Sequence, residues 1–277
     1  MAFLCRYYGA SRSGFYAWRR RGESRRVKAD CELRTKIRQL HEDSRGTYGS
    51  PRVYQALRRE GIRVGEKRVA RLMREARLQA RIARVYRRQP GLHRFFAKTP
   101  NLRLNQPPPS RIDEVWVGDI TYLRVGRVWR YLAAVMDLYS RRLLGWAVGR
   151  SKSMKLTMRA LERAIAARGN APGLMFHSDR GVEYAAHRYQ GLLQAHSIVP
   201  SMNRPYTSQD NAHMESFFHS LKAELLHRRE IGSDGELIAV LAGYIDRFYN
   251  VRRLHSSLGY HSPMEFELTS PRNFTAV

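Results

Sequence analysis

The sequence predicts an α/β layered domain in its second part, preceded by an all-helical and strongly basic region. A proline run within residues 106–110 cannot form a helix interior and separates two differently patterned parts. Before it, apolar residues repeat at helical spacing; after it, strand-like segments come first and helices follow, an order typical of layered α/β domains. We therefore expect a helical region over residues 1–100, a proline-rich linker over 101–112 and an α/β core with C-terminal helices over 113–277.

Positive charge is concentrated in the first of these regions. Residues 1–100 hold 27 lysines and arginines against 8 acidic residues, whereas residues 101–277 hold 23 against 16. A basic region of this strength indicates a polyanionic partner, with nucleic acid the leading candidate. A basic surface that is merely solvated is the alternative.

The cysteine content and hydropathy exclude several classes of protein. With only Cys5 and Cys31, the chain cannot form a disulfide scaffold or a four-cysteine zinc module, which favours a reducing, cytoplasmic setting. The first residues lack the apolar stretch of a signal peptide, and no apolar run reaches the roughly 18 residues that span a bilayer. We expect no membrane attachment.

Two helix-turn-helix candidates lie in the basic region. The first covers residues 7–18, where Ser11 or Ser13 can cap a helix rich in aromatic residues. The second begins at Ser50-Pro51, a helix cap followed by proline at the first helical position, and is interrupted at residues 61–65 before a further helix. We predict that this second pair of helices binds DNA.

The last helix of that pair has the pattern of a recognition helix. Its apolar stripe has helical spacing and consists of Val69, Leu72, Met73 and Ala76. Its other faces carry basic residues, namely Lys67, Arg68, Arg71, Arg74 and Arg77. One side can pack while the other meets phosphates and bases, although a bundle whose arginines are only solvated stays open. Lys67, Arg68, Arg71 and Arg74 are the candidate DNA-binding residues of this helix.

Five strands and four helices are predicted after the proline run. The expected strands are Val115–Leu123, Val128–Leu138, Arg142–Val148, Leu174–His177 and Ser197–Met202. The expected helices are Met154–Ala167, Glu183–His196, Ser208–Arg228 and Glu236–Asn250. The short turns between the first three strands favour antiparallel hairpins.

Two acidic residues occupy strand positions that disfavour a bare carboxylate. Asp119 lies in the middle of an apolar strand, where it needs a cation or an arginine to offset its desolvation. Asp179 ends a short apolar strand, and α/β sheets commonly bind ligands at the carboxyl ends of their strands. A third acid, Glu215, lies on a predicted helix with His219 and Lys222 on a neighbouring stripe. Taken alone, Glu215 fits an exposed surface helix equally well.

The three acids together indicate a magnesium site for phosphoryl transfer. Mg²⁺ prefers oxygen ligands and takes one or two carboxylates together with phosphate oxygens. Two such ions about 3.5–4 Å apart can activate the attacking oxygen and stabilise the leaving one. His177, His213 and His219 lie beside the acids, but they are too scattered for an obvious zinc site, and we expect structural or DNA-contacting roles for them. Mn²⁺ is expected to substitute for Mg²⁺.

Several motifs together resemble the insertion-sequence transposases of the IS3 family, specifically the product of their second reading frame. The matching segments of the core are WVGDITYL (116–123), YLAAVMDLYSRRLLGWAV (131–148), HSDRGVEY (177–184), SQDNAHMESFFHSLKAELLH (208–227) and YNVRRLHSSLGYHSPMEFE (249–267). Upstream, ASRSGFYAWRRR (10–21) and GTYGSPRVYQALRREGIRVGEKRVARLM (46–73) are similar to the family's DNA-binding segments. The family's last two catalytic acids have 35 residues between them, as do Asp179 and Glu215, and its basic residue seven positions further on is matched by Lys222.

This resemblance implies a fold, an activity and partners. The fold would be RNase H-like, with a five-stranded mixed sheet flanked by helices, as in retroviral integrases. Asp119, Asp179 and Glu215 would be the metal-binding catalytic triad of a polynucleotidyl transferase that frees a 3′-hydroxyl at an element end and uses it to attack another phosphodiester. Lys222 would contact DNA. The implied partners are double-stranded DNA of the element ends and target, further copies of this chain on that DNA, and the protein of the first reading frame, in the bacterial cytoplasm or nucleoid.

Asp137, Asp210 and Asn211 also lie in family-like segments, and we expect supporting roles for them, with Asp210 as the reserve catalytic candidate. Two other functions stay open beside the strand transferase. One is a DNA-binding regulator of transposition that keeps the fold without the chemistry. The other is a nuclease acting on RNA–DNA hybrids, which the basic helical region disfavours.

Overall fold

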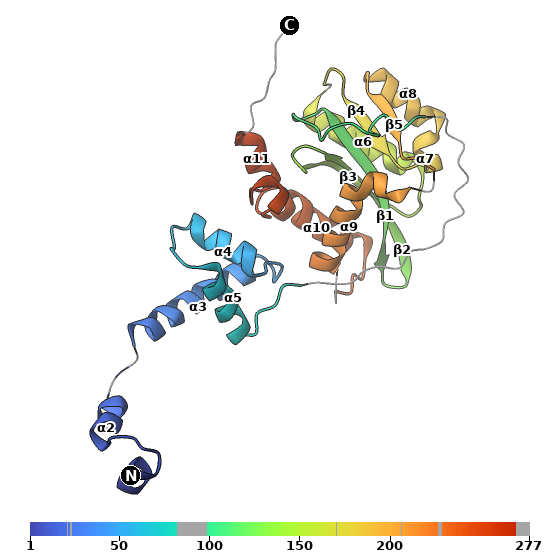
Figure 1. The fold of residues 1–277 in the computed structure, drawn as a ribbon. Helices are drawn as coiled ribbons and strands as arrows, with labels where there is room; N and C mark the ends of the chain where they lie inside the picture. Colours follow the sequence, from blue (N-terminus) through green and yellow to red (C-terminus); the bar gives the residue numbers. More distant parts are fainter. Residues whose placement is uncertain are drawn as a thin grey trace. The chain divides into compact units, whose positions relative to one another are not determined.

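The computed structural model of this chain describes residues 1–20, 22, 24–81, 99–169, 171–205, 207–226 and 229–269. Two units are present, Met1–Arg81 and Ile82–Val277 (Figure 1). Residues 82–98 of the predicted helical region lie outside the described residues, and so does Arg228, the predicted end of a helix. No helix within the described ranges is both long and apolar enough to cross a membrane.

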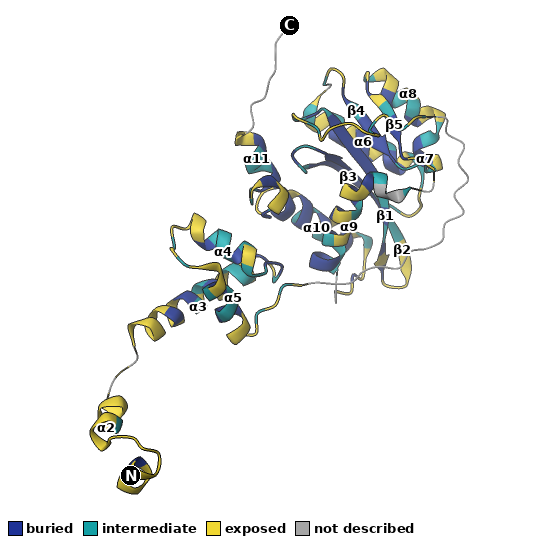
Figure 2. Cartoon of the chain, viewed as in Figure 1, coloured by how far each residue is buried: buried dark blue, intermediate teal, exposed yellow. Residues whose placement is uncertain are grey.

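The first unit is helical. Its helices are α1 (Ala2–Tyr7), α2 (Arg12–Arg20), α3 (Arg25–Asp43), α4 (Ser50–Arg59) and α5 (Glu66–Glu75). Helices α3, α4 and α5 contact one another around a small apolar core of Leu33, Ile37, Val53, Leu57, Val69, Leu72 and Met73. The predicted apolar stripe of the second candidate therefore packs as expected, whereas α1 and α2 are largely exposed (Figure 2).

Local details of these helices agree with the sequence-based expectation in one place and differ from it in two. Ser11 caps α2, because its Oγ accepts a hydrogen bond from Gly14 N at 3.0 Å. Helix α4 already includes Ser50, and Gly49 is the residue before it. The long α3 was not expected, because only Leu33 and Ile37 among its apolar residues are buried and no continuous stripe marks it.

The second unit is built on a five-stranded mixed sheet, which confirms the predicted fold class. The strands are β1 (Val115–Val125), β2 (Val128–Asp137), β3 (Leu143–Gly149), β4 (Met175–Ser178) and β5 (Val199–Met202). Their order is β3-β2-β1-β4-β5, with β1, β2 and β3 antiparallel and β4 and β5 parallel to β1. The central strand β1 therefore has a hairpin partner on one side and a crossover partner on the other.

Helices pack against the sheet and share its core. They are α6 (Met154–Arg168), α7 (Val182–Ala185), α8 (His187–Ala195), α9 (Ala212–Leu221), α10 (Asp234–Tyr244) and α11 (Pro263–Thr269). Residues from α6 and α8 pack with Trp116 and Phe176, which are register partners on β1 and β4. Since side chains alternate along a strand, Asp119 faces away from the layer that holds Trp116.

Three of the predicted helices are subdivided. The expected helix over residues 183–196 is interrupted at Ala186, whose backbone is extended, and Gln190 Nε2 donates to the Tyr184 carbonyl at 2.6 Å beside this break. The expected helix from Ser208 begins as a 3₁₀ turn (Ser208–Asn211), continues as α9 and ends in a π turn (Lys222–Leu226). A second π turn, Ile245–Tyr249, follows α10.

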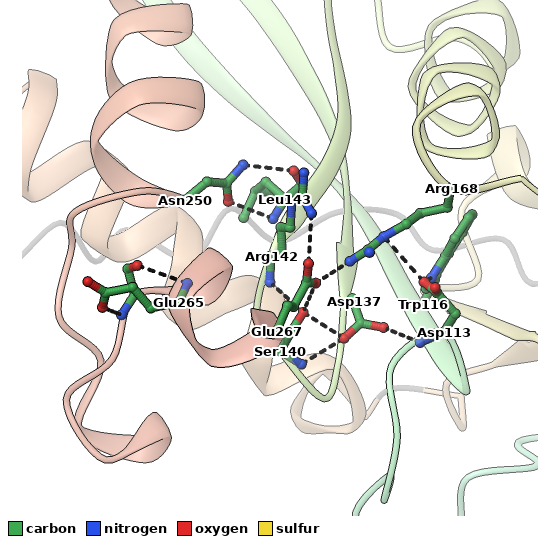
Figure 3. Close-up of polar contacts among 11 residues, drawn as sticks. Asp113, Trp116, Asp137, Ser140, Arg142, Leu143, Arg168, Asn250, Glu265 and Glu267 are labelled. Atoms are coloured by element: carbon green, nitrogen blue, oxygen red, sulfur yellow. Dashed lines mark hydrogen bonds and ion pairs between the residues drawn. The ribbon is translucent and has the colours of Figure 1, made fainter. Parts of the chain in front are cut away.

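A buried polar network joins α11 to the sheet (Figure 3). Glu267, on α11, accepts hydrogen bonds from Arg142 Nη1 and Ser140 Oγ, both at 2.7 Å, and forms an ion pair with Arg168. Ser140 Oγ also lies 2.8 Å from Asp137 Oδ1, and burial raises the pKa of Asp137 to about 6. The C-terminal helix is thus fixed by charge pairing as well as by apolar packing.

Neutralising Glu267 should destabilise this unit. In Glu267→Gln the buried guanidinium of Arg168 keeps its charge and loses the closer of its two carboxylate partners, since only Asp113 Oδ1, 3.5 Å from its Nε, remains. We therefore expect the free energy of unfolding to fall by about 3 kcal/mol. Urea denaturation of both proteins measures this difference. The exposed acid Glu162 gives the control, since Glu162→Gln should change stability by less than about 0.5 kcal/mol. Equal midpoints for all three proteins would contradict a stabilising network.

Candidate active site

Two of the predicted acids lie on adjacent strands at the centre of the sheet, Asp119 within β1 and Asp179 directly after β4. Gly118 of β1 is the register partner of Ser178 on β4, and Asp119 and Asp179 are the next residues along the two strands. Because β1 and β4 are parallel, these carboxylates belong to neighbouring positions at one place in the sheet. The crossover between the strands brings together acids that are 60 positions apart in sequence.

Backbone amides hold both carboxylates. Asp119 Oδ1 accepts from the Ile120 amide at 2.7 Å, and Asp179 Oδ1 accepts from the Gly181 amide at 3.0 Å. Hydrogen bonds from amides restrict the side-chain rotamers and favour the ionised carboxylate. Each acid also keeps a second oxygen, which can serve another ligand.

The third acid, Glu215, enters from α9, which contacts β1. The start of this helix is fixed to the strand by Asn211, whose buried side-chain Nδ2 donates to the Gly118 carbonyl at 3.1 Å. Glu215 lies one turn further along and is partly buried. Asn211 therefore has a structural role in the geometry of the site, in line with the supporting role that the sequence indicated.

The electrostatics of Asp119 reflect its neighbours. Burial, followed by the negative charges of Asp179 and Glu215, raises the pKa of Asp119 to about 8, while the Ile120 amide and the charge of Lys152 act in the opposite direction. A carboxylate with two acidic neighbours is stabilised in its ionised form by a bound cation. Asp179 and Glu215 thus lie close enough to Asp119 in the structure to act on its pKa.

Lys222 also lies at this site. Its ammonium is 4.4 Å from the centre of the Tyr122 ring, a cation–π contact, and it occupies the first position of the π turn after α9. Burial lowers the pKa of Lys222, whereas the charge of Asp119 raises it. The wider π turn often marks functional positions in helices, and it was not expected from the sequence.

The three histidines and Asp210, the remaining candidates of the second unit, have the following positions and contacts. His177 is buried and its Nδ1 lies 2.9 Å from Ser201 Oγ of β5, whereas His213 and His219 are exposed on α9.

Asp210 is paired with Arg204, with Nη2 to Oδ1 at 2.9 Å, and it also accepts a hydrogen bond from Asn101 Nδ2 at 2.8 Å. Arg204 keeps the pKa of Asp210 below its ordinary value. Asp210 therefore links residues at the predicted linker to the core.

The four candidates on α5 fall into two groups. Arg68 and Arg71 form ion pairs with Asp30 on α3, and Arg71 also pairs with Glu75. Their hydrogen bonds hold the pKa of Asp30 below its ordinary range. Lys67 and Arg74, by contrast, are exposed. The first group helps to hold α5 against α3, which the sequence did not indicate.

Two charged residues near the acids were not among the sequence candidates. Glu183, in α7, is buried, and Lys152, just before α6, lies 3.5 Å from its Oε2. Glu183 follows Asp179 by four positions, a spacing that could have drawn attention to it. Lys152 lies in a short loop without a motif, and only the fold brings it to the site.

The donor set at these three positions consists of carboxylates, which suits a hard divalent cation such as Mg²⁺. The raised pKa of Asp119 also favours a bound cation, because burial and then the neighbouring negative charges destabilise its ionised form. Among the described residues, no three side chains of His, Cys, Asp or Glu are gathered closely enough to enclose an ion.

The fold of the second unit is that of an integrase-type core. Residues 109–208 and 196–263 match the integrase core domain family, and residues 28–86 match an HTH-like domain. A 31 kDa protein of the insertion element IS600 from Shigella sonnei is 38% identical over 95% of this chain and 97% of its own length. The transposase InsF of the insertion sequence IS3A from Escherichia coli is 34% identical over 95% of this chain and 92% of its own.

The chain belongs to the IS3 family of insertion-element transposases. Its fold is also similar to a protein chain in the intasome of simian T-cell lymphotropic virus in complex with a regulatory subunit of PP2A, with a TM-score of 0.50, 16% identity, and coverage of 86% of this chain and 76% of the other. The expected family and the expected RNase H-like fold are both confirmed.

Proposed function

We propose that this chain catalyses Mg²⁺-dependent cleavage and strand transfer of DNA at the ends of an insertion element. The observation that supports this most directly is the placement of Asp119 and Asp179 immediately after a register pair of adjacent parallel strands. Glu215 from α9 adds a third carboxylate whose charge acts on Asp119. Membership of a transposase family with an integrase core gives the reaction class.

Asp119, Asp179 and Glu215 would hold the metal ions through their carboxylate oxygens. When bound, two Mg²⁺ ions supply Lewis-acid activation of the attacking oxygen and charge stabilisation at the leaving one. The chain's part is to fix the acids: amides of Ile120 and Gly181 orient two of them, and Asn211 sets the start of α9. Lys222 would bind a DNA phosphate, since its ammonium lies over Tyr122 near Asp119.

A strand-transfer assay tests this proposal. The protein is incubated with Mg²⁺ and labelled duplex DNA that carries the element's own ends, and joined products are separated from substrate. Transfer by the wild type supports the proposal, and Mn²⁺ should replace Mg²⁺. DNA binding without any transfer, in the presence of the first-frame protein as well, would instead favour a non-catalytic regulator. Preferential cleavage of an RNA–DNA hybrid would point to a nuclease.

Metal-free stability offers an independent test of the acid cluster. Because the pKa of Asp119 is raised in the folded state, the folded chain binds this proton more tightly than the unfolded chain does. Wild-type stability should therefore fall as pH rises from about 4 to about 8, and Asp119→Asn should remove this loss. We expect the variant to be more stable by about 2 kcal/mol at pH 8, after allowance for partial solvent access, with a smaller gain at pH 5.

Thermal unfolding in EDTA at both pH values measures this gain. Addition of Mg²⁺ should then raise the melting temperature of the wild type and leave that of Asp119→Asn unchanged. A gain that is the same at pH 5 and pH 8 would contradict the raised pKa. An equal Mg²⁺ effect on both proteins would contradict a metal site at Asp119.

For the first unit we propose that α5 contacts DNA through its exposed basic residues. Lys67→Ala and Arg74→Ala should each reduce the slope of log affinity against log salt by about 1, because each removes one phosphate contact. Arg68→Ala and Arg71→Ala should also lower thermal stability, because each withdraws a partner from Asp30. Fluorescence anisotropy with a duplex element end at several salt concentrations gives the slopes. Unchanged slopes for Lys67→Ala and Arg74→Ala would place α5 away from the DNA.

A further inference from the structure

Lys152 and Glu183 form an ion pair at the edge of the acid cluster. The Lys152 Nζ lies 3.5 Å from Glu183 Oε2, and their side chains are 42% and 7% exposed, respectively. The lysine therefore reaches solvent while the acid is buried. Glu183 Oε2 accepts no hydrogen bond from any described residue, and its ion pair is with the ammonium of Lys152.

The carboxylate of Glu183 and that of Asp179, a member of the predicted triad, both lie close to Gly181. A Cβ atom placed on Gly181 would lie 2.5 Å from Glu183 Oε2 and 3.0 Å from Asp179 Oδ1. Both carboxylates therefore approach the same glycine in the turn between β4 and α7. Any side chain at position 181 would displace at least one of them.

Lys152 is within the electrostatic reach of Asp119 as well, and its charge opposes the effect of burial on that acid. A lysine whose ammonium pairs with a buried carboxylate and whose side chain is two-fifths exposed can bind an approaching phosphate while it keeps this ion pair. Its long side chain would otherwise have to be ordered when DNA binds, at a cost in conformational entropy. The pair with Glu183 therefore prepares Lys152 for a phosphate.

We infer that Lys152 binds a DNA phosphate beside the acid cluster and that Glu183 is the positioning residue that holds it there. This inference rests on the proposed function, because it assigns the phosphate to DNA held at the triad. Lys152 would then be a second phosphate-binding lysine beside Lys222, which lies 70 positions further along the sequence and is held over the Tyr122 ring. The ligand is the sugar–phosphate backbone, so the contact carries no sequence preference.

The test measures DNA binding by the full chain. A duplex of the element end is used with Mg²⁺ omitted, and affinity is followed from about 50 to about 200 mM salt. Lys152→Ala should reduce the salt slope by about 1, so that it loses about threefold less affinity than the wild type over this range. Lys155→Ala, which removes an exposed lysine three positions along, is the matched control and should keep the wild-type slope. Lys152→Arg should keep it too.

The variant Glu183→Gln tests whether Glu183 affects DNA binding only by holding Lys152 in position. It should weaken binding part of the way toward Lys152→Ala, and the double variant should bind as Lys152→Ala does, because Glu183 acts only through the lysine. Methylphosphonates at the last few phosphates of the duplex should weaken binding by the wild type more than binding by Lys152→Ala, which keeps the contact from Lys222. Additive losses in the double variant, or a normal salt slope for Lys152→Ala, would overturn the inference.

Metal binding provides the remaining readout. Glu183→Gln should retain the Mg²⁺-induced rise in melting temperature; loss of that rise would make Glu183 a metal ligand and overturn the positioning role. Strand transfer is assayed in parallel with Glu215→Gln. If the wild type binds DNA with the Lys152-dependent slope but performs no transfer, the proposed function fails and the phosphate contact stands.

Discussion

Glu215→Gln should abolish strand transfer while leaving DNA binding intact. The substitution keeps the shape of the side chain and removes the negative charge that a divalent cation needs. We expect the transfer rate to fall on the order of 10³-fold or more, about 4 kcal/mol of transition-state stabilisation, since a lost ligand disturbs both the attacking and the leaving oxygen. The rate is measured by single-turnover joining of labelled element ends to a target duplex.

Three further single variants test whether the loss of strand transfer is confined to the acids of the triad. Asp119→Asn should be as inactive as Glu215→Gln, and the double variant should be no worse, because the acids act as one unit. Glu162→Gln, an exposed acid on α6, should keep wild-type activity. Asp210→Asn tests the reserve candidate: its pairing with Arg204 and Asn101 predicts altered stability with the chemistry retained. Full transfer by Glu215→Gln would remove this glutamate from the triad.

The sequence predicted the sheet well because its strands carry strong local signals. β1 and β2 are apolar runs with a turn at Gly126 between them, and the antiparallel register follows from that short turn. The approach of Asp119 to Asp179 is a consequence of topology: β4 must pair with β1 and not with another strand. Helical spacing could place Glu215 at the edge of a buried stripe, but only the Asn211 contact shows how α9 is attached to β1.

The features that escaped prediction depend on contacts distant in sequence. Helix α3 has few buried apolar residues and is joined to α5 partly through Asp30, Arg68 and Arg71. A helical pattern cannot show that arginines on its polar face already have acidic partners. Similarly, Lys152 gains its position only when the loop before α6 meets α7, which carries Glu183. Charge pairs between elements have no sequence period, so the sequence alone could not reveal them.

Gly145→Ala should strongly destabilise the core, because the added methyl group has no space between the sheet and α6. Gly145 lies on β3, and a Cβ atom there would be 2.2 Å from the Ala160 carbonyl oxygen and 2.6 Å from the Ala164 amide nitrogen. Both contacts are with the backbone of α6, which cannot change rotamer to make room. The helix would have to move away from the sheet and open the interface that Ala160 and Ala164 now fill.

We expect a loss of about 3 kcal/mol or more in the free energy of unfolding, which for a unit of this size lowers the melting temperature by about 6–12 °C. The matched control is Gly191→Ala on α8, where the added methyl group meets nothing within 4 Å. That variant should gain about 0.5–1 kcal/mol, because alanine is the better helix former. Urea and thermal denaturation of both variants separate the effects of close packing from those of glycine replacement. If Gly145→Ala were as stable as the wild type, α6 could not lie as close to β3 as the structure places it, and the loop that presents Lys152 would be less firmly held.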